Sequence, residues 1–248
     1  MEAYVKSDII NGVGEVEFFH PKSNSLPSNL LNELAQTITI LGENDKAKCI
    51  LLKSGGEKAF CAGASFDELL SIKSKEDGKA FFSGFARVIA AIKNAPKFVV
   101  TLVQGKVVGG GVGVVCASDY VIANENASCK LSELSIGIGP FVIGPAVERK
   151  IGLGHFNNMS LNPTCWKSAS WGLDKGMYAE VVDDVKARGA EIVNQYVRYS
   201  PEAMFEMKTM FWKGADGIEA DMIKRAKQSG TLVLSDFTKE TLKAFKSK

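Results

Sequence analysis

The sequence predicts an α/β fold followed by a helical region toward the C-terminus. Short apolar runs typical of buried strands alternate with longer amphipathic stretches through the first three-fifths of the chain, and stretches of helical periodicity dominate beyond Gly154. The chain has 248 residues, enough for one domain with a small appendage. We therefore expect a core over residues 1–182 and, over residues 183–248, a helical packing and oligomerisation region rather than an independent domain.

The first expected elements are a hairpin, a helix and a buried strand. Asn11-Gly12 separates the apolar-rich runs 5–10 and 13–19, and this dipeptide is a strong hairpin signal because both positions tolerate positive φ. Pro27 then opens a stretch whose leucines and isoleucines recur at helical spacing. The run 48–53 is short and apolar, as in a buried strand.

Two glycine-bearing segments, 60–64 and 108–113, each join an expected strand to an expected helix. The helix between them starts at Ser74, with an acid at its third helical position, and ends before Pro96. Backbone N–H groups at a strand-to-helix junction lack intrahelical partners. Two such groups brought together would form a hole for a developing negative oxygen. The two segments therefore predict acyl or thioester chemistry.

The remaining elements are a buried helix, two strands and a series of helices. We expect the buried helix over 112–117, after an apolar strand over 98–103. Further strands are expected over 120–123 and 177–182. The helices expected in the C-terminal region cover 183–199, 201–213, 218–235 and 238–246.

Composition and charge exclude several classes of protein. The formal net charge is +2, so there is no general electrostatic reason to expect binding to nucleic acid or to an anionic membrane. The 5 cysteines form no C-x-x-C, and there are only 2 histidines, so we expect neither a metal site nor a disulfide framework. The N-terminus lacks the pattern of a leader, and no apolar stretch approaches the roughly 20 residues of a membrane span. We expect a soluble, cytoplasmic protein.

The glycine segments do not match the common nucleotide-binding motifs. The dinucleotide motif G-x-G-x-x-G fails in both candidate registers, because valine occupies the third glycine position at Val114 and at Val142. No P-loop sequence G-x-x-x-x-G-K-[ST] occurs. Taken alone, segment 108–113 is equally consistent with close helix–strand packing.

Glu133 is the candidate for general acid–base chemistry. No Ser–His–Asp arrangement is visible; His20 fits a turn and His155 a helix start, so we expect no covalent nucleophile. Glu133 lies in the apolar, glycine-containing segment 131–139, where burial would raise its pKa and suit it to proton transfer near neutral pH. A capping or ion-paired role for Glu133 remains an alternative at this point.

Together these segments resemble the crotonase, or enoyl-CoA hydratase/isomerase, superfamily. The resemblance extends over residues 4–180 and is carried by segments 13–26, 58–69, 104–111, 118–123, 131–139 and 145–152. It implies a crotonase-like β-β-α spiral over 1–182 that holds an acyl-CoA site, with a helical trimerisation region over 183–248. It also implies a homo-trimer or a hexamer made of two trimers.

The resemblance assigns roles to individual residues. It implies that the N–H groups of Ala64 and Gly110 hold the thioester oxygen and that Glu133 carries the proton. Coenzyme A is then part of the substrate, and no separate cofactor is expected. The residues expected to border coenzyme A are Ser25, Leu26, Ala62 and Phe66. Lys246 is a candidate to reach a coenzyme A phosphate on a neighbouring subunit.

The chain departs from the family pattern at Gly113. Hydratases of the family commonly carry two glutamates twenty positions apart, and here Gly113 takes the place of the first and Glu133 that of the second. Adding water by the two-acid mechanism needs both glutamates. Moving a double bond between C3 and C2 needs only one group, which removes a proton and returns it. The departure therefore favours isomerisation, or dehydration and hydration that depend on one glutamate.

Other side chains near the motifs have simpler interpretations. Ser65, where the family often has Asp, fits a helix N-cap. Trp166 and Trp171 lie past the expected site and are interpreted as packing residues. Three acids that could replace the missing glutamate, but fit solvated helix positions better, are Asp67, Glu68 and Glu148.

Two alternatives to an acyl-CoA hydratase/isomerase stay open. The Gly113/Glu133 pattern, with Cys61, also resembles the dehydratases that act on 3-hydroxy-3-methylglutaryl groups bound to acyl carrier protein in polyketide β-branching. An acyl carrier protein would then be a partner. The other alternative is a non-catalytic acyl-thioester-binding paralogue, for which Gly113 is the only support.

Overall fold

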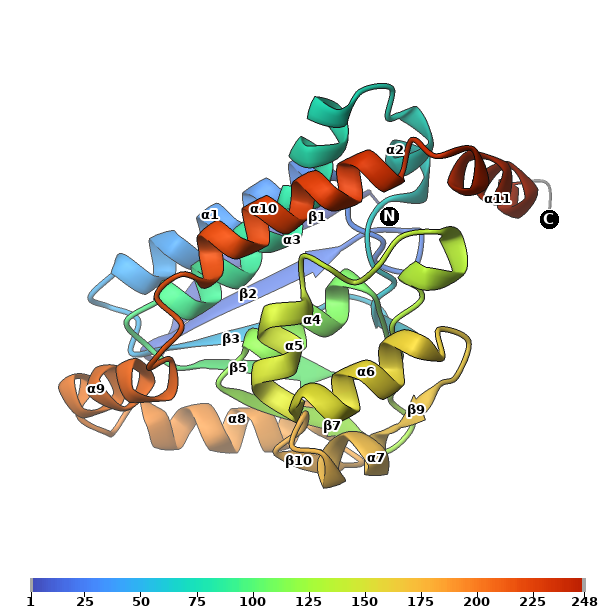
Figure 1. Ribbon diagram of the computed structural model, residues 1–248. Coiled ribbons are helices and arrows are strands. Elements are labelled where there is room, and N and C mark those ends of the chain that lie inside the picture. The colour runs from blue at the N-terminus through green and yellow to red at the C-terminus, as the bar shows by residue number, and fades with distance from the viewer. Residues whose placement is uncertain (1, 247–248) are drawn as a thin grey trace.

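The computed structural model describes residues 2–246 and contains two sheets of mostly parallel strands (Figure 1). The six-stranded sheet has the order β1-β2-β3-β5-β7-β10, with only the β1–β2 pair antiparallel. Its strands are β1 (Tyr4–Ile10), β2 (Val13–Phe19), β3 (Cys49–Ser54), β5 (Val99–Val103), β7 (Tyr120–Asn124) and β10 (Glu180–Val182). The four-stranded sheet has the order β4-β6-β8-β9. Its strands are β4 (Ala59–Cys61), β6 (Lys106–Val108), β8 (Ser128–Lys130) and β9 (Lys167–Ser168).

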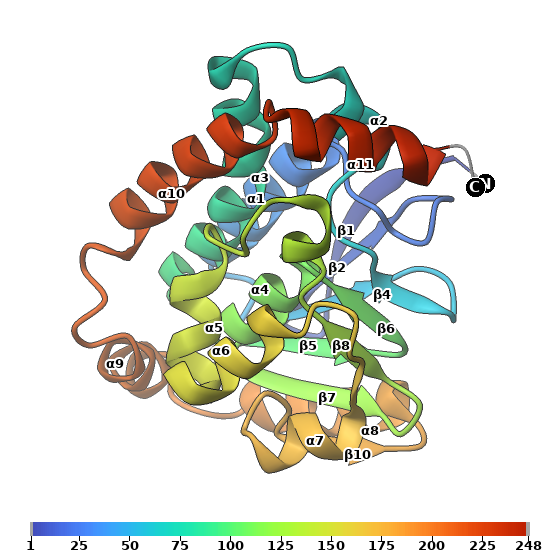
Figure 2. The same cartoon turned by 45° about the vertical axis from the view of Figure 1, so that its right-hand side comes forward.

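The chain alternates between the two sheets in three successive turns. β3, β5 and β7 are neighbours in the large sheet, and each is followed by a short strand, β4, β6 or β8, in the small sheet (Figure 2). A helical segment follows each of these strand pairs: α2, α4 or η1. This arrangement confirms the predicted α/β fold and its β-β-α spiral.

Sequence signals mark the starts of two helices, α2 and α3, among the helices of the described residues. The described helices are α1 (Ser28–Glu43), α2 (Phe66–Ser71), α3 (Lys75–Asn94), α4 (Gly110–Ala117), the 3-10 helix η1 (Glu133–Ile136), α5 (Gly144–Ile151), α6 (Leu153–Leu161), α7 (Ala169–Asp174), α8 (Val185–Tyr196), α9 (Pro201–Phe211), α10 (Ile218–Leu232) and α11 (Asp236–Lys246). Ser65 caps α2 by accepting from the N–H of Glu68 at 3.4 Å, as predicted. Ser74 and Asp77 form a reciprocal capping box at α3.

The strand expected over 177–182 is shorter in the structure. Met177 and Tyr178 do not join the sheet, because both N–H groups donate to the carbonyl oxygen of Gly172, at 2.8 and 3.2 Å. Both side chains are buried in the core. The strand therefore starts only at Glu180.

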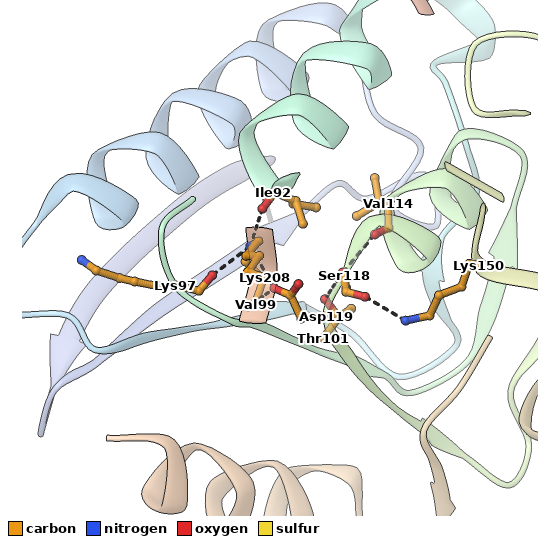
Figure 3. A network of polar contacts seen from close by, with 9 residues as sticks. All are labelled: Ile92, Lys97, Val99, Thr101, Val114, Ser118, Asp119, Lys150 and Lys208. Carbon is orange, nitrogen blue, oxygen red and sulfur yellow. Dashed lines mark hydrogen bonds and ion pairs between the residues drawn. The ribbon is translucent and has the colours of Figure 1, made fainter. Parts of the chain in front are cut away.

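The C-terminal helices of the described chain pack against the spiral. α10 lies along α3 (Figure 1), and a Cβ on Gly78 would lie only 2.6 Å from the Cα of Gly230, so the two backbones touch where the helices cross. α9 is joined to the core by a buried ion pair between Lys208 and Asp119, with 2.9 Å between Nζ and Oδ2 (Figure 3). Division at residue 182 and trimerisation stay predictions. No helix within residues 2–246 combines the length and apolarity needed to cross a membrane.

Candidate functional site

A cavity of about 450 Å³ lies where the two glycine segments meet α2, α3 and the loop after η1. Its lining is mainly apolar. Five phenyl rings contribute to it, from Phe66, Phe81, Phe82, Phe85 and Phe141. A space of this size and character suits the acyl part of a thioester, which is kept away from bulk water.

The first glycine segment directs the N–H of Ala64 away from its backbone neighbours. The N–H of Leu26 donates to the carbonyl of Gly63 at 2.8 Å, and the N–H of Ser65 donates to the carbonyl of Leu26 at 2.9 Å. Because the peptide between Gly63 and Ala64 is trans and planar, the N–H of Ala64 points to the opposite side from Leu26. Ala64 lines the cavity, and its N–H finds no acceptor among the described residues.

The second glycine segment turns into α4 at the same cavity. Gly109 has φ 54° and ψ −120°, a conformation that favours glycine, and Gly110 is the first residue of the helix. The N–H of Gly110 therefore has no intrahelical acceptor. A Cβ on Gly110 would lie 2.4 Å from the ring of Phe85, so only glycine fits there. A Cβ on Gly63 would lie 4.0 Å from the nitrogen of Gly110, which places the two predicted N–H donors on adjacent loops.

Glu133 is the first residue of η1 and reaches the second segment with its carboxyl group. A Cβ on Gly109 would lie 3.0 Å from Oε1 of Glu133, so this glycine leaves room for the carboxyl. The residue is half-buried as a whole, but Oε2 is buried and has no hydrogen-bond partner among the described residues. Burial raises the pKa of Glu133 to about 7, although hydrogen bonds from the backbone of Glu133 and Ser132 offset part of the rise. The carboxyl is thus poised for proton transfer near neutral pH.

There is no space for a second acid at Gly113. A Cβ at this position would lie 2.5 Å from Cγ2 of Ile143 and 3.0 Å from Cδ1 of Ile89. The three acids considered as replacements lie elsewhere. Glu68 accepts from the N–H of Ser28 at 2.7 Å, Asp67 pairs with Lys22, and Glu148 is an exposed residue of α5. Among the described residues, Glu133 contributes the one carboxylate of the lining.

The residues expected to border coenzyme A fall into two groups. Ala62 and Phe66 line the cavity. Leu26 is buried, with a relative exposure of 1%, and supports the first segment through its backbone. The hydroxyl of Ser25 donates to the carbonyl of Ala64 at 3.3 Å, also from outside the lining. Contact of these four residues with coenzyme A stays a prediction.

Sequence reasoning missed Asn24, which organises the turn before Ser25. Its φ is 56°, and its side-chain nitrogen donates to the carbonyls of Gly55 and Ala59, at 2.8 and 2.9 Å. Its Oδ1 accepts from the N–H of His20 at 2.8 Å, which confirms the turn predicted for His20. The signal was available, because asparagine is among the residues that tolerate left-handed backbone in turns.

The interpretation of Trp166 as a packing residue is wrong. It is 39% exposed, and its indole lines the cavity together with Lys130. The ammonium groups of Lys130 and Lys106 lie 4.5 and 5.3 Å from its ring centroid. Trp171 is instead half-buried against the core, as predicted. No local sequence pattern singles out either lysine.

The chain is similar to a known protein family and to several curated proteins. A family model described as enoyl-CoA hydratase/isomerase matches residues 8–248. A probable enoyl-CoA hydratase of Bacillus subtilis (strain 168) is 26% identical over 247 residues, covering 95% of this chain and 93% of the relative. The bacillaene synthase dehydratase PksH of the same organism is 29% identical over 169 residues, covering 66% of this chain and 65% of the relative.

The fold itself matches a solved structure. The crystal structure of an enoyl-CoA hydratase from Bacillus halodurans superposes with a TM-score of 0.89 at 21% identity, covering 97% of this chain and 99% of the other. The matched family model spans nearly the whole chain, including both glycine segments and Glu133. The chain therefore belongs to the enoyl-CoA hydratase/isomerase family of the crotonase superfamily.

Proposed function

We propose that this protein converts a 3-enoyl-CoA thioester to the 2-enoyl isomer, so that the double bond moves from C3–C4 to C2–C3. Glu133 is the single proton carrier. The observation that carries the proposal is the packing of Ile143 against Gly113, which leaves no room for a second acid. The two-acid mechanism of water addition needs a second carboxylate to orient the water, and the described cavity lining provides only that of Glu133. Transfer of one proton between two carbons needs only Glu133.

In the proposed reaction, the N–H groups of Ala64 and Gly110 hold the thioester oxygen. The carboxylate of Glu133 removes a proton from C2 of a 3-enoyl group, and the electrons of the C2–H bond pass into a dienolate whose charge rests on that oxygen. Glu133 then returns the proton to C4, which leaves the double bond between C2 and C3. Each N–H donor is expected to lower the barrier by about 3 kcal/mol, because it stabilises the oxygen most in the charged state.

The test is to incubate 3-enoyl-CoA, 2-enoyl-CoA and 3-hydroxyacyl-CoA substrates with the enzyme in deuterated water. Mass spectrometry and NMR identify the products and the carbons that gain deuterium. We expect conversion of 3-enoyl to 2-enoyl, with deuterium at C2 or C4. Rapid formation of 3-hydroxyacyl product without isomerisation would overturn the proposal.

The second candidate is dehydration of a 3-hydroxyacyl group attached to a carrier protein. What supports it is the similarity to the bacillaene synthase dehydratase PksH, together with the single Glu133. Glu133 would remove the C2 proton and protonate the departing hydroxyl at C3. Presenting the same 3-hydroxyacyl group on coenzyme A and on an acyl carrier protein separates the candidates. A strong preference for the carrier-bound form would favour the second.

A non-catalytic paralogue that only binds acyl thioesters is the third possibility. The buried Oε2 of Glu133 and the N–H groups of Ala64 and Gly110, which have no hydrogen-bond partner in the described part of the chain, argue against it. Deuterium uptake at C2 or C4 of a bound enoyl-CoA would exclude it.

We further propose a homo-trimer or hexamer in the cytoplasm, requiring no cofactor besides the coenzyme A of the substrate. Light scattering with mass determination would separate trimer from hexamer. The contact proposed for Lys246 involves a side chain outside the described part of the structure.

A further inference from the structure

The apolar cavity contains one positively charged side chain among its described lining residues, that of Lys130. The other polar groups of the lining are hydroxyls, the indole of Trp166, backbone groups and the carboxyl of Glu133. Lys130 is half-buried, and the ring that its ammonium meets is that of Trp166, which is 39% exposed.

The strand pairing places Lys130 on the cavity side of the small sheet. Lys130 is opposite Val108 in the parallel β6–β8 pair, and Val108 also lines the cavity. The preceding residue, Cys129, points to the other face and is fully buried. The N–H of Gly109 donates to the carbonyl of Lys130 at 3.0 Å, while the Cα of Gly109 faces the carboxyl of Glu133. Lys130 is therefore fixed beside the second glycine segment.

The ammonium of Lys130 is oriented but not neutralised. It lies 4.5 Å from the ring centroid of Trp166, an attraction that restricts its position. No carboxylate within residues 2–246 forms an ion pair with it. Glu133 does not serve as its partner. A preoriented cation without a counter-ion, at the side of a substrate cavity, is a site for an anionic group.

We propose that the acyl group of the substrate carries a carboxylate, and that Lys130 binds it. This inference rests on the proposed function, because it assigns the substrate class of the same cavity. A carboxylate entering an apolar cavity loses its hydration and is repelled by ionised Glu133. The ammonium of Lys130 compensates both costs. An acyl chain of the same length that has no free carboxylate would gain nothing from the side chain of Lys130.

The experiment compares glutaconyl-CoA with its methyl ester, which differ in the charge of the acyl end. The readout is the rate of solvent deuterium incorporation at C4, measured for the wild type and for Lys130→Met. We expect the ratio of kcat/KM for the acid to that for the ester to fall by about 30-fold, since hydrogen bonds to charged groups contribute this order of discrimination. Lys130→Arg, which keeps the charge, should retain most of the preference.

Lys106→Met is the matched control. Its ammonium contacts the same indole at 5.3 Å, but Lys106 does not line the cavity. The variant should therefore keep the wild-type preference to within about threefold, as for a surface charge. An equal loss for acid and ester in Lys130→Met, or the same shift in Lys106→Met, would overturn the proposal.

A binding measurement separates this inference from the proposed reaction. Calorimetric titration of Glu133→Gln, and of the double variant that adds Lys130→Met, with each thioester needs no turnover. Tighter binding of the acid that disappears with Lys130→Met supports the carboxylate site even if no isomerisation is detected. Equal affinities for acid and ester in Glu133→Gln reject the site, whatever the catalytic outcome.

Discussion

At the scale of single residues, the site depends on how the protein isolates one carboxyl group from water. Oε2 of Glu133 has no hydrogen-bond partner within residues 2–246, and burial raises the pKa of the group to about 7. A carboxylate so weakly solvated is a stronger base than one in water, and it needs no large reorganisation to take up a proton.

Replacing Glu133 with glutamine should abolish most of the activity without unfolding the protein. Glutamine has nearly the same shape but cannot accept the proton from C2, so turnover of a 3-enoyl-CoA should fall by at least ~100-fold. Circular dichroism and thermal melting provide the folding control. Near-wild-type turnover by the variant would show that another group carries the proton.

The pH dependence of kcat/KM should report the titration of Glu133 in the free enzyme. The base is active when ionised, so kcat/KM should rise about tenfold per pH unit below a pKa of about 7 and level off above it. Initial rates between pH 5 and pH 9, using a substrate without ionisable groups in the acyl chain, provide the measurement. A profile already flat at pH 5 would mean that the carboxyl is well solvated.

The same burial should make Glu133 a cost to stability at high pH. In the folded protein the pKa of Glu133 lies above its ordinary value of 4.5. The folded state therefore binds the proton more tightly than the unfolded state. The group's unfavourable contribution is therefore absent below about pH 4.5, grows as the pH rises to about 7, and is constant above that. The unfolding free energy of Glu133→Gln minus that of the wild type should therefore increase by about 3 kcal/mol from pH 4 to pH 8. Urea titrations of the wild type and the variant at pH 4 and at pH 8 test this. The same stability difference between the two proteins at both pH values would contradict it.

At the scale of elements, glycines let helices and loops approach closely enough to form the cavity. Gly113 is the most informative, because α4 meets Ile143 at this point, just before α5. The close contact explains why α4 offers no room for a second acid at Gly113.

Gly113→Ala should be destabilising, by about 1–3 kcal/mol, because the added Cβ would lie 2.5 Å from Cγ2 of Ile143. Combining it with Ile143→Ala, which removes that Cγ2, should recover part of the loss, and a double-mutant cycle in urea measures the coupling. Gly154→Ala is the control, because a Cβ on Gly154 in α6 would have no described neighbour within 4 Å. Wild-type stability of Gly113→Ala would mean that the helix can accommodate a side chain, and would weaken the single-glutamate proposal.

Elements with local signals could be predicted from the sequence, and elements made by distant pairing could not. The hairpin at Asn11-Gly12 follows from the residues at the turn, where φ is 51° and 84°. The caps at Ser65 and Ser74 likewise involve residues three positions apart. The small sheet has strands of only two or three residues, too short to show a period of two.

The same distinction between local signals and distant pairing applies to the residues of the candidate site. Glu133 and the glycine segments could be identified because their chemistry lies within short stretches of sequence. The encounter of Lys130 with Trp166 depends on the antiparallel pairing of β8 with β9, in which Ser128 is opposite Ser168. That register joins parts of the chain that η1, α5 and α6 separate, and no local pattern predicts it.

At the scale of the whole molecule, a buried polar network connects α9 to the spiral (Figure 3). Asp119, directly before β7, pairs with Lys208 of α9 and also accepts from the N–H of Val99 at 2.7 Å. Nζ of Lys208 donates to the carbonyls of Ile92 and Lys97, at 2.7 and 2.8 Å. Burial lowers the pKa of Lys208 and raises that of Asp119, so desolvation outweighs the attraction between them in both groups.

Removing one member of this pair should therefore be far more damaging than removing both. Lys208→Met leaves Asp119 unpaired in a site where the two side chains are only 3% and 6% exposed, and should cost about 3–5 kcal/mol of unfolding free energy. Lys208→Met with Asp119→Asn should recover much of that loss, because neither member of the pair is then left as an isolated charge. Lys93→Met is the control, since its partner Glu219 is 43% exposed, and it should cost less than about 1 kcal/mol. Urea unfolding of the four proteins gives these differences, and a Lys208→Met variant as stable as the control would show that α9 is held to the spiral by its apolar contacts alone.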